Sequence, residues 1–231
     1  MNFGGYGLYI LISLPALLLG FYAQSKVQGS FKKYSQVRTS NGMTGADVAR
    51  KILDFNGLQD VQIEQTQGTL SDHYDPRKKV LRLSQGVHSV PSVAAAGIAA
   101  HEAGHAIQHA TKYGPLALRS LMVPTVQLGS WIGPIVFMIG LLMANESMAI
   151  LGLILFGATA VFAIITVPVE MDASKRAKTM LNSSGILYSS EMVGVEKVLD
   201  AAALTYVAGA IQVVSTLLYY ALLLFGGRRR S

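Results

Sequence analysis

Four apolar runs, each close to the length that crosses a lipid bilayer, constrain the fold of this chain more than any other feature of its sequence. A membrane-spanning helix needs about 20 consecutive, mainly apolar residues. The runs cover residues 6–23, 121–143, 148–167 and 204–225. Only 14% of the residues are charged, whereas soluble domains usually carry about 25%. We therefore expect a mainly α-helical integral membrane protein with about four transmembrane helices.

The first run, 6–23, also invites comparison with a cleaved signal peptide. A signal peptide has a basic residue before its apolar part and a small-x-small cleavage site after it. This run is preceded by no Lys or Arg, its apolar part is long, and it lacks such a cleavage site. We expect it to be retained as a membrane helix.

The basic residues near the helix ends predict the orientation of the chain. Four of them follow the first run closely, and none precedes it: Lys26, Lys32, Lys33 and Arg38. Because cytoplasmic loops carry an excess of Lys and Arg, the N-terminus is expected outside and the next segment in the cytoplasm. The cation-free connection 144–147 suits the outside, and the basic cluster at 175–178 suits the inside. The basic tail at 228–230 does not fit, because a fourth crossing would place it outside.

These spans and charges divide the chain into five predicted segments. In order they are 1–23 (transmembrane helix 1), 24–120 (a cytoplasmic α+β segment), 121–168 (transmembrane helices 2 and 3), 169–203 (a cytoplasmic helical segment), and 204–231 (transmembrane helix 4 and the basic tail). The net charge of +6 is explained by this orientation and by attraction to anionic lipid. No basic face with stacking aromatic residues is evident, so we expect no nucleic-acid partner.

The predicted α+β segment carries signals for a helix and two strands. Thr44 with Asp47 three residues later resembles a helix start, and the helical pattern ends at Gly57. Apolar and polar residues alternate over 61–67 and 79–84, which predicts a hairpin or a pair of edge strands.

The Ala-rich stretch 92–111 contains the pattern H-E-x-x-H. Alanine is the best helix former, so this stretch is expected to be helical. His101 and His105 then lie on one face, about 6 Å apart along the axis, and can converge on one ion. Glu102 points to a neighbouring face, where its carboxylate can meet a metal-bound water. Chance would give this pattern in about a few per thousand such chains, so we interpret it as a metal site.

The other ligands of this site must be His, Asp or Glu, because the chain has no cysteine. His109 follows His101 by eight residues, or about 12 Å along the helix axis, which is too far to share its ion. We expect His109 to be a polar residue at the helix end. His73 and His88 remain as other candidates.

The third ligand should lie on the same side of the membrane as His101, which excludes Glu146. The remaining acidic candidates are Glu170, Asp172, Glu191, Glu196 and Asp200. We favour Glu170, which follows Pro168 at the end of an apolar run, where a carboxylate without a partner is costly. The alternative is a carboxylate at the start of a new helix, stabilised there by the helix dipole.

The sequence resembles the YugP-type membrane zinc metallopeptidases of bacteria. The resemblance extends over nearly the whole chain and includes DHYDPRKKVLRLS at 72–84, HEAGHAIQHA at 101–110 and PVEMDASKRA at 168–177. It implies a multi-pass protein of the bacterial plasma membrane with a small, zincin-like α+β portion in the cytoplasm.

More remotely, VEMDAS is similar to the E-x-x-A-D motif of the HtpX and Ste24 type membrane proteases. That similarity implies that Glu170 is the third zinc ligand, in a gluzincin-like set with His101 and His105. The final aspartate of the motif, a partner of a ligating histidine, is replaced by Ser174. Asp172 could take over this role, or Ser174 could serve more weakly.

Together these features predict a zinc-dependent endopeptidase with one Zn²⁺ per chain and Glu102 as the general base. Its substrates would be peptides or proteins, membrane proteins included, and an extended substrate could pair with an edge strand at VLRLS. Four residues are candidates for stabilising the oxyanion: His73, Tyr74, Arg176 and Tyr188. Self-association stays open, because small residues such as Gly129, Gly133 and Gly140 suit contacts within or between chains.

Two other classes of protein compete with this prediction. A carboxylate-bridged di-iron oxidase would need a second E-x-x-H and two further glutamates, and no second copy exists. A non-catalytic zinc-binding membrane scaffold or chaperone would have no use for the general base at Glu102.

Overall fold

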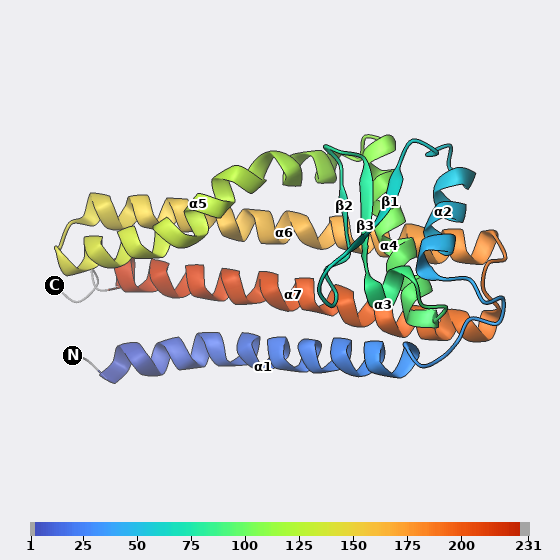
Figure 1. Cartoon of the computed structure of the whole chain (residues 1–231). Helices are drawn as coiled ribbons and strands as arrows, with labels where there is room; N and C mark the ends of the chain where they lie inside the picture. The colour runs from blue at the N-terminus through green and yellow to red at the C-terminus, as the bar shows by residue number, and fades with distance from the viewer. Residues whose placement is uncertain (1–2, 227–231) are drawn as a thin grey trace. The chain divides into compact units, whose positions relative to one another are not determined.

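The structure, a computed structural model, describes residues 3–226 and divides into two compact units. The first unit holds the described residues up to Tyr22, then Ala117–Pro168, and those from Thr205 onward. The second unit holds Ala23–Leu116 and Val169–Leu204. Four helices have part of their length in each unit (Figure 1): α1 (Phe3–Tyr34), α5 (Gly114–Leu142), α6 (Glu146–Ser183) and α7 (Ser189–Gly226).

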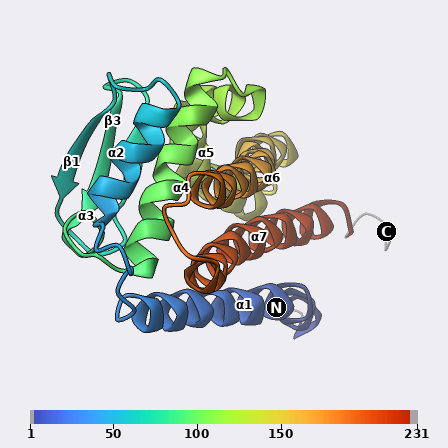
Figure 2. The same cartoon turned by 90° about the vertical axis from the view of Figure 1, so that its right-hand side faces the viewer.

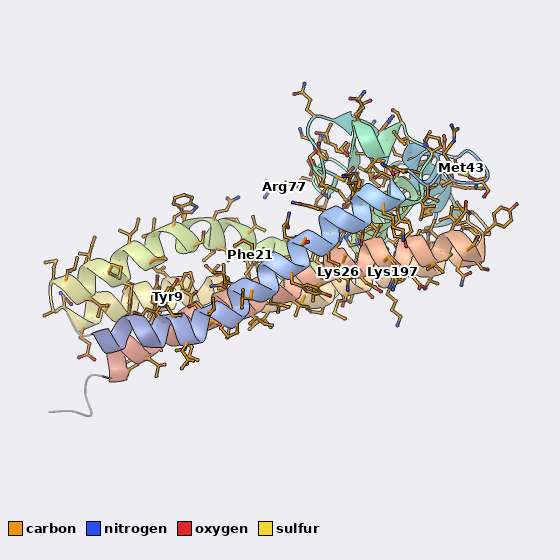
Figure 3. All side chains as sticks on the ribbon, turned by 90° about the horizontal axis from the view of Figure 1, so that it is seen from below. Tyr9, Phe21, Lys26, Met43, Arg77 and Lys197 are labelled. Atoms are coloured by element: carbon orange, nitrogen blue, oxygen red, sulfur yellow. The ribbon has the colours of Figure 1, made fainter. Side chains whose placement is uncertain are left out.

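These four helices are long and apolar enough to cross a membrane. Many large apolar side chains of the first unit are exposed, among them Tyr9 and Phe21 on α1, which Figure 3 labels. Large exposed apolar surfaces are typical of membrane contact. The prediction of a mainly α membrane protein with a small α+β portion is therefore confirmed. The basic tail, Arg228–Arg230, lies outside the described residues.

In the first unit, α5 and α6 approach each other closely at glycines. A Cβ atom built on Gly129 would lie 2.6 Å from the backbone oxygen of Leu155, and one on Gly133 would lie 2.7 Å from the backbone nitrogen of Phe156. Small residues at such positions let the backbones of membrane helices come together. These glycines therefore serve packing within the chain and give no support to an oligomer.

The second unit contains a three-stranded sheet in the order β1-β3-β2. Its strands are β1 (Gln62–Thr66), β2 (His73–Asp75) and β3 (Val80–Ser84). The central strand β3 pairs parallel to β1 and antiparallel to β2. The predicted hairpin of the first and last strands is wrong, because residues 76–79 form a short connection that joins β2 to β3 as an antiparallel pair. VLRLS is therefore central, and both of its edges are already paired, so a substrate cannot add to it.

The helices α2 (Gly45–Phe55), α3 (Gln85–His88) and α4 (Val93–Ala110) complete this unit. The predicted start of α2 is confirmed as a capping box: the backbone N–H of Asp47 donates to the Thr44 hydroxyl, and the Asp47 carboxylate accepts from the backbone N–H of Thr44. Ser92 caps α4 by accepting from the backbone N–H of Ala95.

The helix α4 lies between the sheet and the later part of α6 (Figure 2). Most of its residues are small and buried, alanine above all. A Cβ atom on Gly104 would lie 2.6 Å from the backbone oxygen of Ala173 on α6, which only a glycine avoids without moving the helix. Small side chains thus allow α4 to pack on both sides.

The alternative explanation of Glu170, a carboxylate at the start of a new helix, is wrong. The helix continues without a break from Glu146 to Ser183, so no new helix begins after Pro168. A proline inside a helix leaves one backbone carbonyl without its donor, and long membrane helices tolerate this loss. Glu170 therefore lies in a helix interior, and the helix dipole, which acts only at the first turn, does not explain its position.

Candidate metal centre

Three polar side chains follow one face of α4 toward α6. They are His101, His105 and Gln108, at relative positions i, i+4 and i+7, which the helical repeat places one above another. We call these three residues the histidine stripe. All three side chains are largely or fully buried.

The carboxylate of Glu170 on α6 faces the two histidines of this stripe. Its Oε2 atom lies 3.1 Å from Nε2 of His101 and 3.4 Å from Nε2 of His105. In a tetrahedral zinc site with bonds of about 2.1 Å, neighbouring ligand atoms lie about 3.4 Å apart. The separations and the nitrogen and oxygen donors therefore fit zinc. Within residues 3–226, these three side chains form the cluster that could hold a metal ion.

The electrostatics of this cluster favour a positive charge. Burial disfavours the imidazolium form of His105, but the hydrogen bond with Glu170 and the charge of Glu102 outweigh this and raise the pKa of His105. A site that stabilises a buried proton between carboxylates will also stabilise a metal cation there.

The second ring nitrogen of each histidine has its own partner. Nδ1 of His101 lies 3.0 Å from the hydroxyl of Ser174, and Nδ1 of His105 lies 2.9 Å from Oε1 of Gln108. A partner at Nδ1 orients the ring and leaves the lone pair at Nε2 for a metal. Both rings therefore turn Nε2 toward Glu170.

Gln108 is the residue of this centre that sequence reasoning did not identify. It is fully buried, and its amide nitrogen donates to the backbone oxygen of Val169 and to the carboxylate of Asp172, each at 2.8 Å. Its Oε1 atom is therefore the acceptor toward His105, whose Nδ1 carries the proton. The available signal was a lone amide three residues after a candidate ligand, in a helix of small and apolar residues.

Asp172 and Ser174, which the sequence left as alternatives, contact different parts of the centre. Ser174 contacts His101 directly, whereas Asp172 reaches His105 through Gln108. Asp172 is held in turn by Arg176, whose Nε donates to it at 2.6 Å. Ser174, which replaces the aspartate of the motif, thus contacts His101 through its hydroxyl. Asp172 supports His105 instead, through Gln108.

Two of the predicted oxyanion donors lie in places that do not suit that role. His73 occupies the outer face of the sheet, where its ring contacts Arg82 and the backbone oxygen of Ser71. Tyr188 is exposed and follows the end of α6, about 20 Å along the helix from Glu170. Neither residue is therefore supported as a partner of the metal centre.

A second row of residues runs beside the histidine stripe. Glu102, Ala106, His109 and Ala110 recur at i, i+4, i+7 and i+8 on α4, so they share one face. We call them the glutamate stripe. Glu102 is 8% exposed. His109 is at the helix end, as expected, and its Nδ1 contacts the hydroxyl of Tyr74 at 3.0 Å. Burial and the charges of Asp60 and Asp75 raise the pKa of Tyr74 to about 12.

Comparisons with known proteins agree with these features. The family described as "Putative neutral zinc metallopeptidase" matches residues 9–225. The "Putative membrane protease YugP" of Bacillus subtilis (strain 168) is 47% identical over 221 residues, which cover 96% of this chain and 98% of that protein. No solved structure matches the chain.

Proposed function

This chain belongs to the family of neutral zinc metallopeptidases, and we propose that it is a membrane endopeptidase in which Glu102 is the general base. Zn²⁺ is its cofactor. The observation that carries the proposal is the convergence of two imidazole nitrogens and one buried carboxylate oxygen beside a helix face that bears Glu102.

His101, His105 and Glu170 are the residues that would hold the zinc ion. Three protein ligands leave a fourth position open, as catalytic sites require. Zinc in such a site supplies a Lewis acid, which lowers the pKa of water toward about 7 and polarises a carbonyl group. The burial of Glu170, at 2% exposed, keeps the ligand set away from bulk water.

Glu102 moves the proton in this mechanism. Because it follows His101 by one residue, its carboxylate lies on the neighbouring face of α4, and we expect the substrate carbonyl to approach the metal from that side. It accepts a proton as the oxygen of a water molecule bonds to the carbonyl carbon, then delivers this proton to the amine nitrogen as the C–N bond breaks. The products are a carboxylic acid and an amine, and Glu102 returns to its ionised form.

Gln108 and Ser174 act as positioning residues. Each accepts a hydrogen bond from the Nδ1 atom of one ligating histidine, so that the Nε2 lone pair faces the metal. Gln108 also ties α4 to α6 through Val169 and Asp172. Loss of either side chain would let a ring rotate or change its tautomer.

Arg176 is the one of the four predicted oxyanion donors that is hydrogen-bonded to the network of the ligands. It follows Glu170 by six residues, or about 9 Å along α6, so its side chain would have to move to reach a carbonyl at the metal. It belongs to the hydrogen-bond network of the ligands through Asp172, and its guanidinium keeps further N–H groups. The hydroxyl of Tyr74 instead contacts His109, which lies about 10 Å along α4 from Glu102. At that separation the Tyr74 hydroxyl is too far away to donate a hydrogen bond to a substrate carbonyl at the metal.

We place the active site at the cytoplasmic membrane face. The predicted cytoplasmic segments, 24–120 and 169–203, correspond closely to the second compact unit. Basic residues follow the first and third membrane runs and support this side. Substrates would be peptides or proteins near that face. The alternative, a zinc-binding scaffold or chaperone, still gives Glu102 no role.

A Glu102→Gln variant tests the proposal. In purified full-length protein we expect one zinc per chain in both forms, whereas cleavage of casein falls by about 10²–10⁴-fold in the variant. Glu64→Gln, on the outer face of the sheet, is the matched control and should keep full cleavage. Unchanged cleavage by Glu102→Gln would contradict the role of Glu102, and a bound iron pair would contradict the zinc site.

A further inference from the structure

One line of exposed side chains runs along α6 past the end of its apolar run. Its members are Val161, Ile164, Pro168, Met171 and Lys175, and the steps of three and four residues place them on one face of the helix. The line is apolar as far as Met171, which is 55% exposed, and Lys175 is its first charge. Exposed apolar side chains suit lipid chains, whereas lysine suits the headgroups. The edge of the hydrocarbon core therefore crosses this face between Met171 and Lys175.

The length of the apolar run of α6 leads to the same level. Glu146, the first residue of the helix, and Glu170 are the charges that flank this run, and they lie about 36 Å apart along the axis. The hydrocarbon core of a bilayer is about 30 Å thick, and the headgroups bring the total to about 40–45 Å. A run centred in the core thus leaves Glu170 about 3 Å outside it, within the headgroup layer.

The metal centre shares this level, because its other ligands meet the same carboxylate. Oε2 of Glu170 lies 3.1 Å from Nε2 of His101 and 3.4 Å from Nε2 of His105. The two histidine side chains are 12% and 11% exposed, against 2% for Glu170, so they form the outer side of the centre. A peptide bond that reaches the metal must therefore itself enter the headgroup layer.

Polypeptides differ in how readily they bring a bond to this level. A folded soluble protein must push a loop between the headgroups, whereas a chain with its own membrane-embedded segment always has residues there. Such an anchor also holds the bond near the centre at a high effective concentration. The headgroup layer is about 5–8 Å deep. A bond within it lies about two or three residues from the embedded segment if the chain is extended, and about five if it is helical.

We propose that the substrates are membrane-anchored polypeptides, which are cleaved within about five residues of their membrane-embedded segment. The inference rests on the proposed peptidase function and adds a substrate class to it. The bond is selected by its distance from the bilayer, because the metal centre lies at a fixed level along α6.

The test places one cleavable peptide at different distances from a single transmembrane helix. The peptide is a casein segment that the wild type cleaves, and Gly/Ser spacers of about 3, 10 and 40 residues join it to the helix. Wild-type protein and substrate share vesicles of phosphatidylethanolamine and phosphatidylglycerol. At equal surface density, the cleavage rate should fall by at least about tenfold from the shortest spacer to the longest, because effective concentration falls with spacer length.

Two controls separate distance from mere attachment to the same bilayer. The substrate with the longest spacer is anchored in the bilayer like the others, so it controls for co-localisation. The same casein segment without a helix should be cleaved more slowly than any anchored form. Equal rates for all spacers, or faster cleavage with the longest one, would overturn the inference and leave the peptidase intact.

Binding to inactive protein separates this inference from the proposed function. Fluorescently labelled forms of the same substrates should bind the Glu102→Gln variant most tightly with the shortest spacer and most weakly with the longest. This order of binding without any cleavage by the wild type would contradict the peptidase and keep the membrane-anchored ligand. Binding that is independent of spacer length, with no cleavage, would overturn both.

Discussion

The two stripes of α4 differ by a shift of one residue and by almost everything that surrounds them. The histidine stripe faces α6, and each of its polar groups has a partner on α4 or α6. The C-terminal residues of the glutamate stripe, Ala106, His109 and Ala110, border a cavity and are small or exposed. One face of α4 thus carries the residues that could hold a metal ion, whereas the adjacent face is buried at Glu102 and Ala106 and exposed at His109 and Ala110.

The difference has a structural cause in the contact of α4 with α6. Gly104 lies beside the backbone of Ala173, so the two helices approach closely where His101, His105 and Glu170 meet. Close approach brings Glu170 within hydrogen-bonding distance of His101 and buries Gln108 completely. The C-terminal part of the glutamate stripe instead faces the connection between α2 and β1, where the short side chains of Ala106 and Ala110 line a cavity with Leu58 and Val61.

The largest effect is expected from Glu170→Ala, which removes a ligand from the face opposite the histidine stripe. Zinc affinity should fall by more than the about 100-fold that loss of an outer partner costs, because two buried histidines alone cannot complete the site. Competition with a chelator measures this change. Glu196→Ala, at an exposed position of α7, is the control, and full zinc affinity in Glu170→Ala would remove Glu170 from the ligand set.

Gln108→Ala should have an intermediate effect on the same stripe. It leaves Nδ1 of His105 without its acceptor and Asp172 without one donor, so zinc affinity should fall by about 10–100-fold. The absorption spectrum of cobalt-substituted protein should also change, because the ligand ring is no longer fixed. A lower melting temperature with unchanged metal affinity and spectrum would show that Gln108 only supports packing.

The smallest effect is expected from Tyr74→Phe, beside the glutamate stripe. This change removes the hydrogen bond to His109 and keeps the aromatic ring, so the free energy of unfolding should fall by about 0.5–1.5 kcal/mol. Urea denaturation measures the loss, and zinc affinity should stay within about twofold of the wild type. A tenfold loss of zinc affinity would show that the contact beside the glutamate stripe influences metal binding at the histidine stripe, and would contradict the view that the two stripes are energetically independent.

Much of the centre follows from local rules that act along the chain. The helical repeat places His101 and His105 on one face and Glu102 on the next, whatever α4 packs against. Hydropathy identifies the four candidate spans, because the preference of a helix for lipid over water depends on its own side chains. Glu170 was accessible to the same reasoning, since a carboxylate at the end of an apolar run needs a partner.

The strand order was beyond these rules. The alternation at 61–67 and 79–84 indicates strands but not their neighbours, because pairing depends on segments that are distant in the sequence. The residues between them form β2, and this places VLRLS in the centre of the sheet. The continuity of α6 through Pro168 was also missed, since tertiary and membrane surroundings decide whether a proline ends a helix.

The sequence by itself thus determined the membrane class, the paired histidines and the carboxylate that faces them. Only the tertiary structure decided which outer partner each histidine receives, with Ser174 at His101 and Gln108 at His105. It also placed His73 on the outer face of the sheet and opened the cavity beside Ala110. The physical reason is that helical periodicity fixes the direction of a side chain on its own helix, whereas its partner depends on the rotation and distance of the neighbouring element.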